Sequence, residues 1–304
     1  GSGPLPLPGG NRAMAADPDA AVLPATFGFV GVGVIASAVV RGLCSRGGPS
    51  PPPSFVLSPR GAAKAAVLAA EFPAHVRVAG SNQEVVDAAD CVMIAVLPKQ
   101  AEDVLGSLTF RAGQQVVSLV ATVKLARLRE FIAPATECVI GSPLPSVAEG
   151  RGATLLIPPR PFALNIFKSL GSCVAVEDEA QFKRMQCITA LMGDLYKRQL
   201  TAQEWLQSHG VPSAEAAAWV GADFAAMAAL SSRPGPDTFA HLVAEQTPGG
   251  INEMVWKGQQ EDGNYEAIKH SLDSVHHRLM SGTADPSLNP AVKRAKTGEP
   301  TPKM

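Results

Sequence analysis

The feature that most constrains the fold of this chain is a pair of glycines between a short apolar strand and a helix of small residues. Residues 25–36 read ATFGFVGVGVIA, and SAVVRGLC continues the helical pattern. Gly31, Gly33 and Ala36 match the dinucleotide fingerprint G-x-G-x-x-G/A, with Ala in the third place. In that motif the first Gly makes the turn, the second admits a pyrophosphate, and the third residue lets helix and strand pack closely. The pattern predicts a dinucleotide site; a glycine turn that serves packing alone is the alternative.

Short apolar runs alternate with helical patterns as far as about residue 177. After the first strand the strand-like runs read PSFVLSPR, VRVAGS, DCVMIAVLP, GQQVVSLVA, ECVIGSP and RGATLLIPP. Strands with continuous apolar cores that alternate with helices indicate a parallel sheet covered on both faces. We therefore expect an α/β fold, with a Rossmann-type dinucleotide-binding domain over residues 25–177.

The strand pattern stops after Val176, and every later periodic segment reads as helix. Asp178 to Ala180 provides a helix cap and an entry to this region. Residues 178–282 are expected to form an all-α domain. Residues 1–24 and 283–304 are rich in Pro and poor in large apolar side chains, so both segments are predicted to be disordered.

The composition argues against several classes of function. A formal net charge of −1 over 304 residues gives no electrostatic case for nucleic acid or a membrane surface. No apolar run reaches the ~20 residues of a membrane span without a Pro or a charge. The five cysteines are scattered and form no CxxC, which predicts buried thiols and no metal site. The Pro-rich start lacks the Arg-rich amphipathic pattern of a transit peptide, so we expect a cytoplasmic protein.

The end of the second strand decides which dinucleotide is expected. NAD enzymes usually place an Asp or Glu here to hold the ribose 2′-hydroxyl. This chain has Ser58 and Arg60 instead, a hydroxyl and a guanidinium that suit a 2′-phosphate. We therefore expect NADP rather than NAD, with an ordinary solvated Arg as the alternative.

A second break in the pattern falls late in the chain, where residues 245–253 read EQTPGGINE between helical segments. Pro248, Gly249 and Gly250 end one helix and allow another to begin at Ile251. The free N–H groups of a helix start favour an anion. A plain turn between helices is the alternative.

Six blocks in the right order resemble pyrroline-5-carboxylate reductase, over residues 26–279. The blocks read FGFVGVGVIASAVVRG, LSPRGAAKAAVLAAEF, SNQEVVDAADCVMIAVLPKQ, VVSLVATVKLARL, EGRGATLL and TPGGIN. The residues of the last two blocks look like those of a divergent branch of the family. The resemblance implies a Rossmann domain followed by a helical domain that forms a homodimer with its partner. It also implies that N–H groups exposed by the Pro-Gly-Gly break, those of Gly249 and Gly250, bind a substrate carboxylate beside the nicotinamide.

The resemblance transfers functional positions to this chain. Substrate would contact the loop formed by Thr247, Pro248, Gly249, Gly250 and Ile251, with Thr247 and Asn252 as the catalytic positions. The implied cofactor contacts are Gly31, Val32, Gly33, Val34, Ile35, Ser58, Arg60, Asn82, Ala95, Val96 and Pro98.

Three departures from the family pattern bear on the substrate. The family's Lys before the Pro of its AVKP block is Leu97, and its MPNTP segment is Gly141–Pro145 here. Its two Thr residues after Pro-Gly-Gly are Ile251 and Asn252. Asn252 can exchange hydrogen bonds with a substrate nitrogen but is not a Brønsted acid near neutral pH.

Three hypotheses of function follow. The first is an NADP-dependent reductase that transfers hydride to the C=N bond of a cyclic imino acid or a related carboxylate. The only obvious acids near Asn252 are Glu245, Glu253 and, further off, His241 and Lys257. Because a protonated imine needs no further proton, this favours the first hypothesis over ketone reduction. The second is a β-hydroxyacid-type dehydrogenase that uses Lys257 or His241, although the order and spacing of Asn252 and Lys257 do not match that class. The third is a catalytically silent NADP-binding dimer that acts as a sensor or scaffold.

Overall fold

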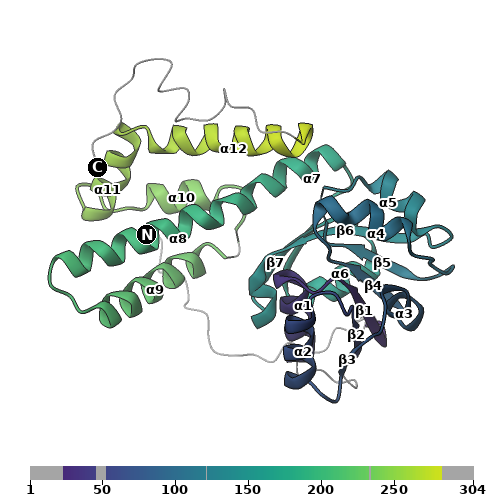
Figure 1. Cartoon of the computed structure of the whole chain (residues 1–304). Helices are drawn as coiled ribbons and strands as arrows, with labels where there is room; N and C mark the ends of the chain where they lie inside the picture. Colours follow the sequence, from purple (N-terminus) through teal and green to yellow (C-terminus); the bar gives the residue numbers. More distant parts are fainter. Residues whose placement is uncertain (1–22, 46–52, 121, 233, 283–304) are drawn as a thin grey trace, which may run out of the picture. The chain divides into compact units, whose positions relative to one another are not determined.

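The computed structural model describes residues 23–45, 53–120, 122–232 and 234–282 (Figure 1). The chain divides into two compact units, 1–182 and 183–304. The division falls inside one helix, five residues beyond the expected domain boundary between 177 and 178. The termini predicted to be disordered lie outside the described residues, apart from Leu23 and Pro24.

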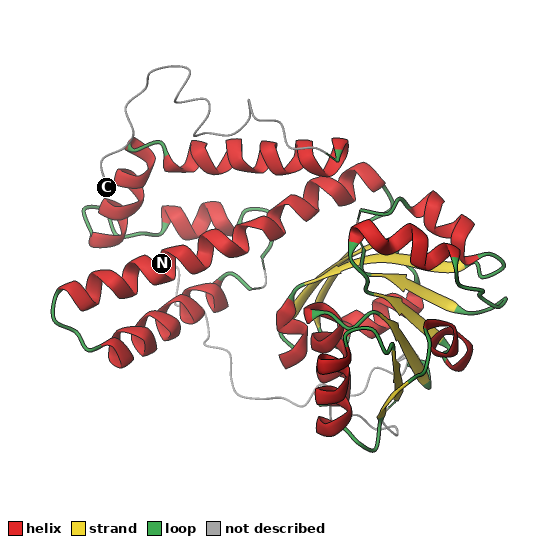
Figure 2. Ribbon diagram, viewed as in Figure 1, coloured by secondary structure: helices red, strands yellow, loops and turns green. Residues whose placement is uncertain are grey.

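Unit 1 is built on an eight-stranded sheet (Figure 2). Its strands are β1 (Thr26–Val30), β2 (Ser54–Leu57), β3 (Val76–Val78), β4 (Cys91–Ile94), β5 (Gln115–Ser118), β6 (Glu137–Pro143), β7 (Gly152–Ile157) and β8 (Gly171–Ala175). The order across the sheet is β3-β2-β1-β4-β5-β6-β7-β8. The first six strands are parallel and follow the Rossmann order 3-2-1-4-5-6, as expected. β7 runs antiparallel to β6, and β8 runs parallel to β7, so the sheet is only mainly parallel.

Helices follow most of these strands. They are α1 (Val34–Cys44), α2 (Ala62–Glu71), α3 (Asn82–Ala88), α4 (Ala101–Gly106), α5 (Leu125–Ile132) and α6 (Pro161–Lys168), with two 3-10 turns, η1 (Pro98–Gln100) and η2 (Pro145–Glu149). Three phenylalanines lie at the centre of the core. Phe27 of β1 stacks on Phe55 of β2 with ring centroids 5.7 Å apart, and Phe29 lies 6.4 Å from Phe55. All three are fully buried, because both faces of these strands are covered.

The sequence pattern did not separate α6 and β8. Pro161 occupies the first turn of α6, where its missing N–H costs nothing. β8 is an edge strand whose residues are only partly covered. Its pairing with β7 depends on a close approach of Gly171 to the backbone of Gly152, which no hydrophobic pattern reveals.

Unit 2 is all α within the described residues, as expected. Its elements are η3 (Cys187–Ala190), α8 (Leu191–Ser208), α9 (Ser213–Leu230), α10 (Thr238–Ala244), α11 (Ile251–Glu261) and α12 (Asn264–Ser281), preceded by α7 (Glu179–Gln186), which crosses the unit boundary. The expected cap is present, since the Asp178 carboxylate accepts a hydrogen bond from the N–H of Gln181 at 2.6 Å. None of the described helices is long and apolar enough to cross a membrane.

Very little of unit 2 is buried. Among its described residues only Lys183, Cys187, Ala216 and Val220 fall in the buried class. Large apolar side chains are exposed on most of its helices, among them Trp205 of α8, Trp219 of α9 and Met254 of α11. Its helices therefore leave much apolar surface uncovered in the single chain.

Candidate dinucleotide and substrate sites

The predicted cofactor residues meet at one edge of the sheet of unit 1. The strand order reverses between β1 and β4, and the loops after β1, β2 and β4 leave the sheet at its carboxyl edge. Ligands of open α/β sheets bind in the crevice at such a switch point. The topology thus brings together the loops of residues 31–33, 58–61 and 95–97.

The two glycines of the fingerprint differ in their surroundings. Gly31 has φ +92°, and a Cβ there would lie 2.7 Å from the carbonyl oxygen of Ala95. Only glycine fits this turn, because both the backbone angle and the close approach exclude a side chain. Gly33 is the N-cap of α1 with an extended backbone, and a Cβ there would meet nothing within 4 Å. The protein itself leaves the space at Gly33 open.

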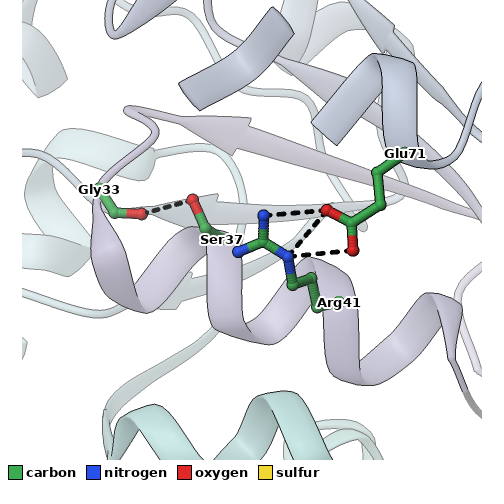
Figure 3. A network of polar contacts seen from close by, with 4 residues as sticks. All are labelled: Gly33, Ser37, Arg41 and Glu71. Atoms are coloured by element: carbon green, nitrogen blue, oxygen red, sulfur yellow. Dashed lines mark hydrogen bonds and ion pairs between the residues drawn. The ribbon is translucent and has the colours of Figure 1, made fainter. Parts of the chain in front are cut away.

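The start of α1 carries the features of an anion site. The N–H groups of the first turn of any helix have no intrahelical acceptor. No side chain caps α1, so these groups are left for an anion. The Ser37 hydroxyl donates to the carbonyl of Gly33 at 2.9 Å (Figure 3). One turn further, Arg41 forms a bidentate ion pair with Glu71 of α2, with Nε 2.9 Å from Oε2. Ala36 is 1% exposed, in keeping with close packing of helix and sheet.

The loop after β2 is organised by a buried hydroxyl. Ser58 has no exposed surface, and its Oγ donates to Oδ1 of Asn82 at 2.6 Å while accepting the N–H of Arg60 at 3.2 Å. The expected donation from Ser58 to a 2′-phosphate is therefore not available in this arrangement. Ser58 instead fixes the Asn82 side chain, so that the amide nitrogen Nδ2 of Asn82 remains free to donate.

A pocket of about 460 Å³ opens beside this loop. It is lined by Pro59, Arg60, Asn82, Gln100, Asp103, Val104 and Ser107. Arg60 is exposed and forms no ion pair with any described carboxylate. α4 contributes an acid, Asp103, to the same pocket, and no sequence pattern indicated it.

Helix α3 positions Asn82, which is its first residue. Ser81 is the N-cap and accepts the N–H of Glu84 at 3.1 Å. The Glu84 carboxylate reaches back to the N–H of Gly80 at 2.7 Å and pairs with Arg77 at 2.8 Å. These bonds lower the pKa of Glu84, the backbone bond being the largest cause. The motif S-x-x-E is that of a capping box, here with Glu84 bound to the N–H just before the N-cap, and these bonds hold the start of the helix and with it Asn82.

The remaining predicted cofactor positions lie around the same opening. Ala95 continues from β4, where its N–H donates to the carbonyl of Val30 at 2.8 Å. Val32 is buried, and Ile35 and Val96 are half-buried. Val34, Leu97 and Pro98 are exposed, so two large apolar side chains face solvent at this edge.

The Pro-Gly-Gly break forms a tight turn in unit 2. The N–H of Gly250 donates to the carbonyl of Thr247 at 2.9 Å, and Gly249 has φ +72°, the left-handed angle that a type II turn requires. A new helix begins at Ile251, as predicted. The N–H of Gly249 donates to Oε2 of Glu253 at 2.8 Å. The two glycine N–H groups expected to hold a carboxylate are thus engaged, and the free donors are those of Ile251 and Asn252.

The side chains around this turn comprise one ion pair, one further carboxylate from Glu245 at the end of α10, and neutral groups. Thr247, Ile251 and Asn252 are exposed. Glu253 pairs with Lys257 one turn along α11, with Nζ 2.7 Å from Oε1. Among the described residues no group of His, Cys, Asp and Glu could hold a metal ion.

Comparison with known proteins supports a dinucleotide site in the first half of unit 1. Residues 26–122 match the family model described as NADP oxidoreductase, coenzyme F420-dependent. This range runs from β1 to just beyond β5, and thus includes the three loops at the switch point. A sequence search of curated proteins finds no match.

Solved structures extend the likeness to the whole fold. A pyrroline-5-carboxylate reductase from Streptococcus pyogenes is similar with a TM-score of 0.70 at 20% identity, covering 84% of this chain and 98% of that one. The enzyme from Plasmodium falciparum with NADP bound has a TM-score of 0.67 at 14% identity, covering 84% and 97%. A reductive aminase from Aspergillus terreus has a TM-score of 0.52 at 18% identity, covering 91% and 95%.

The family match over residues 26–122, the sheet order and the glycine turn are typical of an NADP-oxidoreductase type of dinucleotide-binding domain, which the front unit resembles. The particular likeness is to pyrroline-5-carboxylate reductase. It was expected from six sequence blocks and is confirmed at the level of the fold.

Proposed function

We propose that this protein is an NADPH-dependent reductase that transfers hydride to the C=N bond of a cyclic imine. The observation that carries the proposal is the open, uncapped start of α1 at Gly33, located at the switch point of a Rossmann sheet. When bound, NADPH supplies the hydride, and the protein supplies position and electrostatics. The first-turn N–H groups of α1 would hold the pyrophosphate.

The choice of NADP is supported by the loop after β2. Arg60 and the free amide of Asn82 line one pocket, and the strand ends without an acid. A planar guanidinium with no carboxylate partner suits a 2′-phosphate. Asp103 in the same pocket opposes that charge and would moderate the preference.

The substrate side of the proposal rests on the turn before α11. Thr247 and Asn252 would contact the substrate through hydrogen bonds, with Asn252 orienting its nitrogen. Neither residue is an acid near neutral pH, which suits an imine that already carries its proton. A substrate carboxylate at the helix start would meet the N–H groups of Ile251 and Asn252, because those of Gly249 and Gly250 are engaged.

The structure weakens the β-hydroxyacid dehydrogenase alternative. That reaction needs an acid to protonate the ketone oxygen, and Lys257 is the nearest candidate in the sequence. Its ammonium group is held by Glu253 at 2.7 Å, which restrains the side chain along α11 and away from a substrate oxygen. Only an experiment separates the reductase from the silent NADP-binding dimer, because both would bind NADPH.

We also propose that unit 2 forms a homodimer. Its helices bury very little in the single chain, while sixteen of the twenty-one exposed large apolar side chains lie in it. Apolar surface of this extent is usually covered by a partner. The fold likeness to pyrroline-5-carboxylate reductase agrees with a second copy as that partner.

The first test is ligand binding, then turnover, on the purified full chain. Binding to the folded state raises the melting temperature, so NADPH should raise it clearly and NADH little. NADPH oxidation should follow on addition of 1-pyrroline or its carboxylates and should be absent with keto acids. A shift without turnover would support the silent dimer, and no shift with either nucleotide would sink the proposal.

A further inference from the structure

The turn before α11 already contains a carboxylate from the chain itself. Oε2 of Glu253 accepts the N–H of Gly249 at 2.8 Å, one of the donors expected to hold a substrate carboxylate. Oε1 of the same side chain pairs with Lys257 at 2.7 Å. Both oxygens therefore have fixed partners, and the side chain is only 21% exposed. Glu253 is held at the helix start rather than extended into solvent.

These contacts keep Glu253 negatively charged. The ammonium group of Lys257, and then the N–H of Gly249, lower its pKa below the ordinary value. A negative charge in the first turn of α11 also matches the helix dipole, which reinforces the same state. A second carboxylate that approached the free N–H groups of Ile251 and Asn252 would meet a like charge within one helical turn.

Glu245 at the end of α10 adds a second carboxylate, which is exposed and forms no ion pair among the described residues, and the other groups of this turn are neutral or apolar. Asn252 and Thr247 can exchange hydrogen bonds, while Ile251, Met254 and Val255 expose large apolar surfaces. Lys257 is the cation nearest to Glu253 along the helix, and Glu253 itself neutralises it. Since Glu253 and Lys257 compensate each other, no cation is left here to hold an anion, and Glu245 gives the turn a net negative charge that disfavours an anionic ligand.

We propose that Glu253 is a specificity-determining residue, which fills the anion position at the start of α11 so that the preferred substrate is a cyclic imine without a carboxylate. This inference rests on the proposed function, since it names the substrate class of that same site. A protonated imine is a cation, which the net negative charge of the turn attracts, whereas the carboxylate of an imino acid would have to compete with Glu253 for the donors of the helix start.

Binding of an unreactive carboxylate tests the inference without turnover. Cyclopentanecarboxylate has the ring and the anion but no nitrogen to oxidise, and its affinity can be measured by calorimetry with NADP+ present. Glu253→Ala should bind it at least tenfold more tightly than the wild type, and Glu253→Gln should be intermediate, because Gln keeps the bond to Gly249 without the charge. Glu261→Ala, the same charge change at the far end of α11, should leave the affinity unchanged.

Each other outcome contradicts the inference. If the wild type and both Glu253 variants bind the carboxylate equally, or none binds it, Glu253 does not control an anion position. If the gain disappears in Glu253→Ala/Lys257→Gln, the freed lysine provided it and the helix start did not. Glu253→Gln retains the local hydrogen bond and keeps the test valid where the Ala variant fails to fold.

Turnover separates this inference from the proposed function. The ratio of kcat/KM for 1-pyrroline over 1-pyrroline-5-carboxylate should favour 1-pyrroline in the wild type and fall at least tenfold in Glu253→Ala. An unchanged ratio would refute the role of Glu253 while leaving imine reduction intact. If no imine is reduced, the proposed function fails, and the binding experiment still decides whether Glu253 excludes carboxylates.

Discussion

At the residue scale, the two glycines of the turn after β1 should respond differently to the same added methyl group. Gly33→Ala places its Cβ in open space with an allowed backbone, so the free energy of unfolding of the free protein should fall by no more than about 1 kcal/mol, the difference between Gly and Ala at an N-cap. The methyl group would occupy the approach of the pyrophosphate, so NADPH affinity should fall at least tenfold. Thermal denaturation and titration of NADPH measure the two effects.

Gly31→Ala is the matched comparison. Its Cβ would lie 2.7 Å from the Ala95 carbonyl oxygen at φ +92°, so the fold itself should be destabilised, by roughly 1–3 kcal/mol. Equal loss of stability in both variants would show that Gly33 serves packing and not a ligand.

The pocket beside the loop after β2 makes a second prediction, on the choice between NADPH and NADH. Arg60→Ala should weaken NADPH at least tenfold and leave NADH unchanged, because only NADPH carries the 2′-phosphate. Asp103→Asn should strengthen NADPH a few-fold by removing a like charge from the same pocket. The dissociation constants of NADPH and NADH for each variant test this prediction. A parallel change for NADH in either variant would contradict the assignment of the pocket to the 2′-phosphate.

Residue identity alone revealed part of these sites. Gly31, Gly33 and Arg60 are recognisable because their roles follow from a motif and from position after a strand. The role of Ser58 in orienting Asn82 depends on a contact across 24 residues, which no local pattern contains. Asp103 and Glu253 were missed as site residues, because one joins the pocket through tertiary packing and the other through a side chain that folds back on its own turn.

At the scale of elements, the capping box of α3 ties helix stability to pH. The pKa of Glu84 is lower in the folded chain, so its contribution is present above the ordinary pKa of Glu, near 4.3, and is lost as pH falls through the folded value. Glu84→Gln should therefore be less stable than the wild type at neutral pH, and the difference should shrink in acid.

Urea unfolding at several pH values measures that difference. Glu149→Gln, at an exposed carboxylate with no ion pair among the described residues, is the control and should stay close to the wild type at each pH. A difference between Glu84→Gln and the wild type that persists unchanged in acid would argue against the charged capping box. NADPH affinity should also fall in Glu84→Gln, because Asn82 begins the same helix.

The sequence indicated the first seven strands and the helices of unit 2 because each has a clear hydrophobic period or a clear break. It did not indicate the direction of β7, since an antiparallel strand in a mixed sheet can be as apolar as its parallel neighbours. β8 was not recognised as a strand either, because its edge position leaves alternate residues partly exposed and its pairing depends on the contact between Gly152 and Gly171.

At the scale of the whole molecule, the helices of unit 2 cannot obtain their stability from the single chain. Only four of its described residues are buried, while side chains such as Trp219 are 65% exposed. A homodimer would bury this surface, so the melting temperature should rise with protein concentration. Trp219→Glu should give a monomer in sedimentation equilibrium and remove that concentration dependence, since a charge inside an apolar interface has no partner.

Val67→Glu provides the matched control for that experiment. Val67 is also an exposed apolar side chain, 54% accessible, but it lies on α2 in unit 1. It should leave both the mass and the melting temperature unchanged, because the proposed interface belongs to unit 2 alone. A wild-type chain that sediments as a monomer at every concentration would refute the dimer, and the exposed helices would then require a partner of another kind. If the dimer forms, loss of association in Trp219→Glu should also lower the free energy of unfolding of unit 2 more than that of unit 1, because only unit 1 has a core of its own.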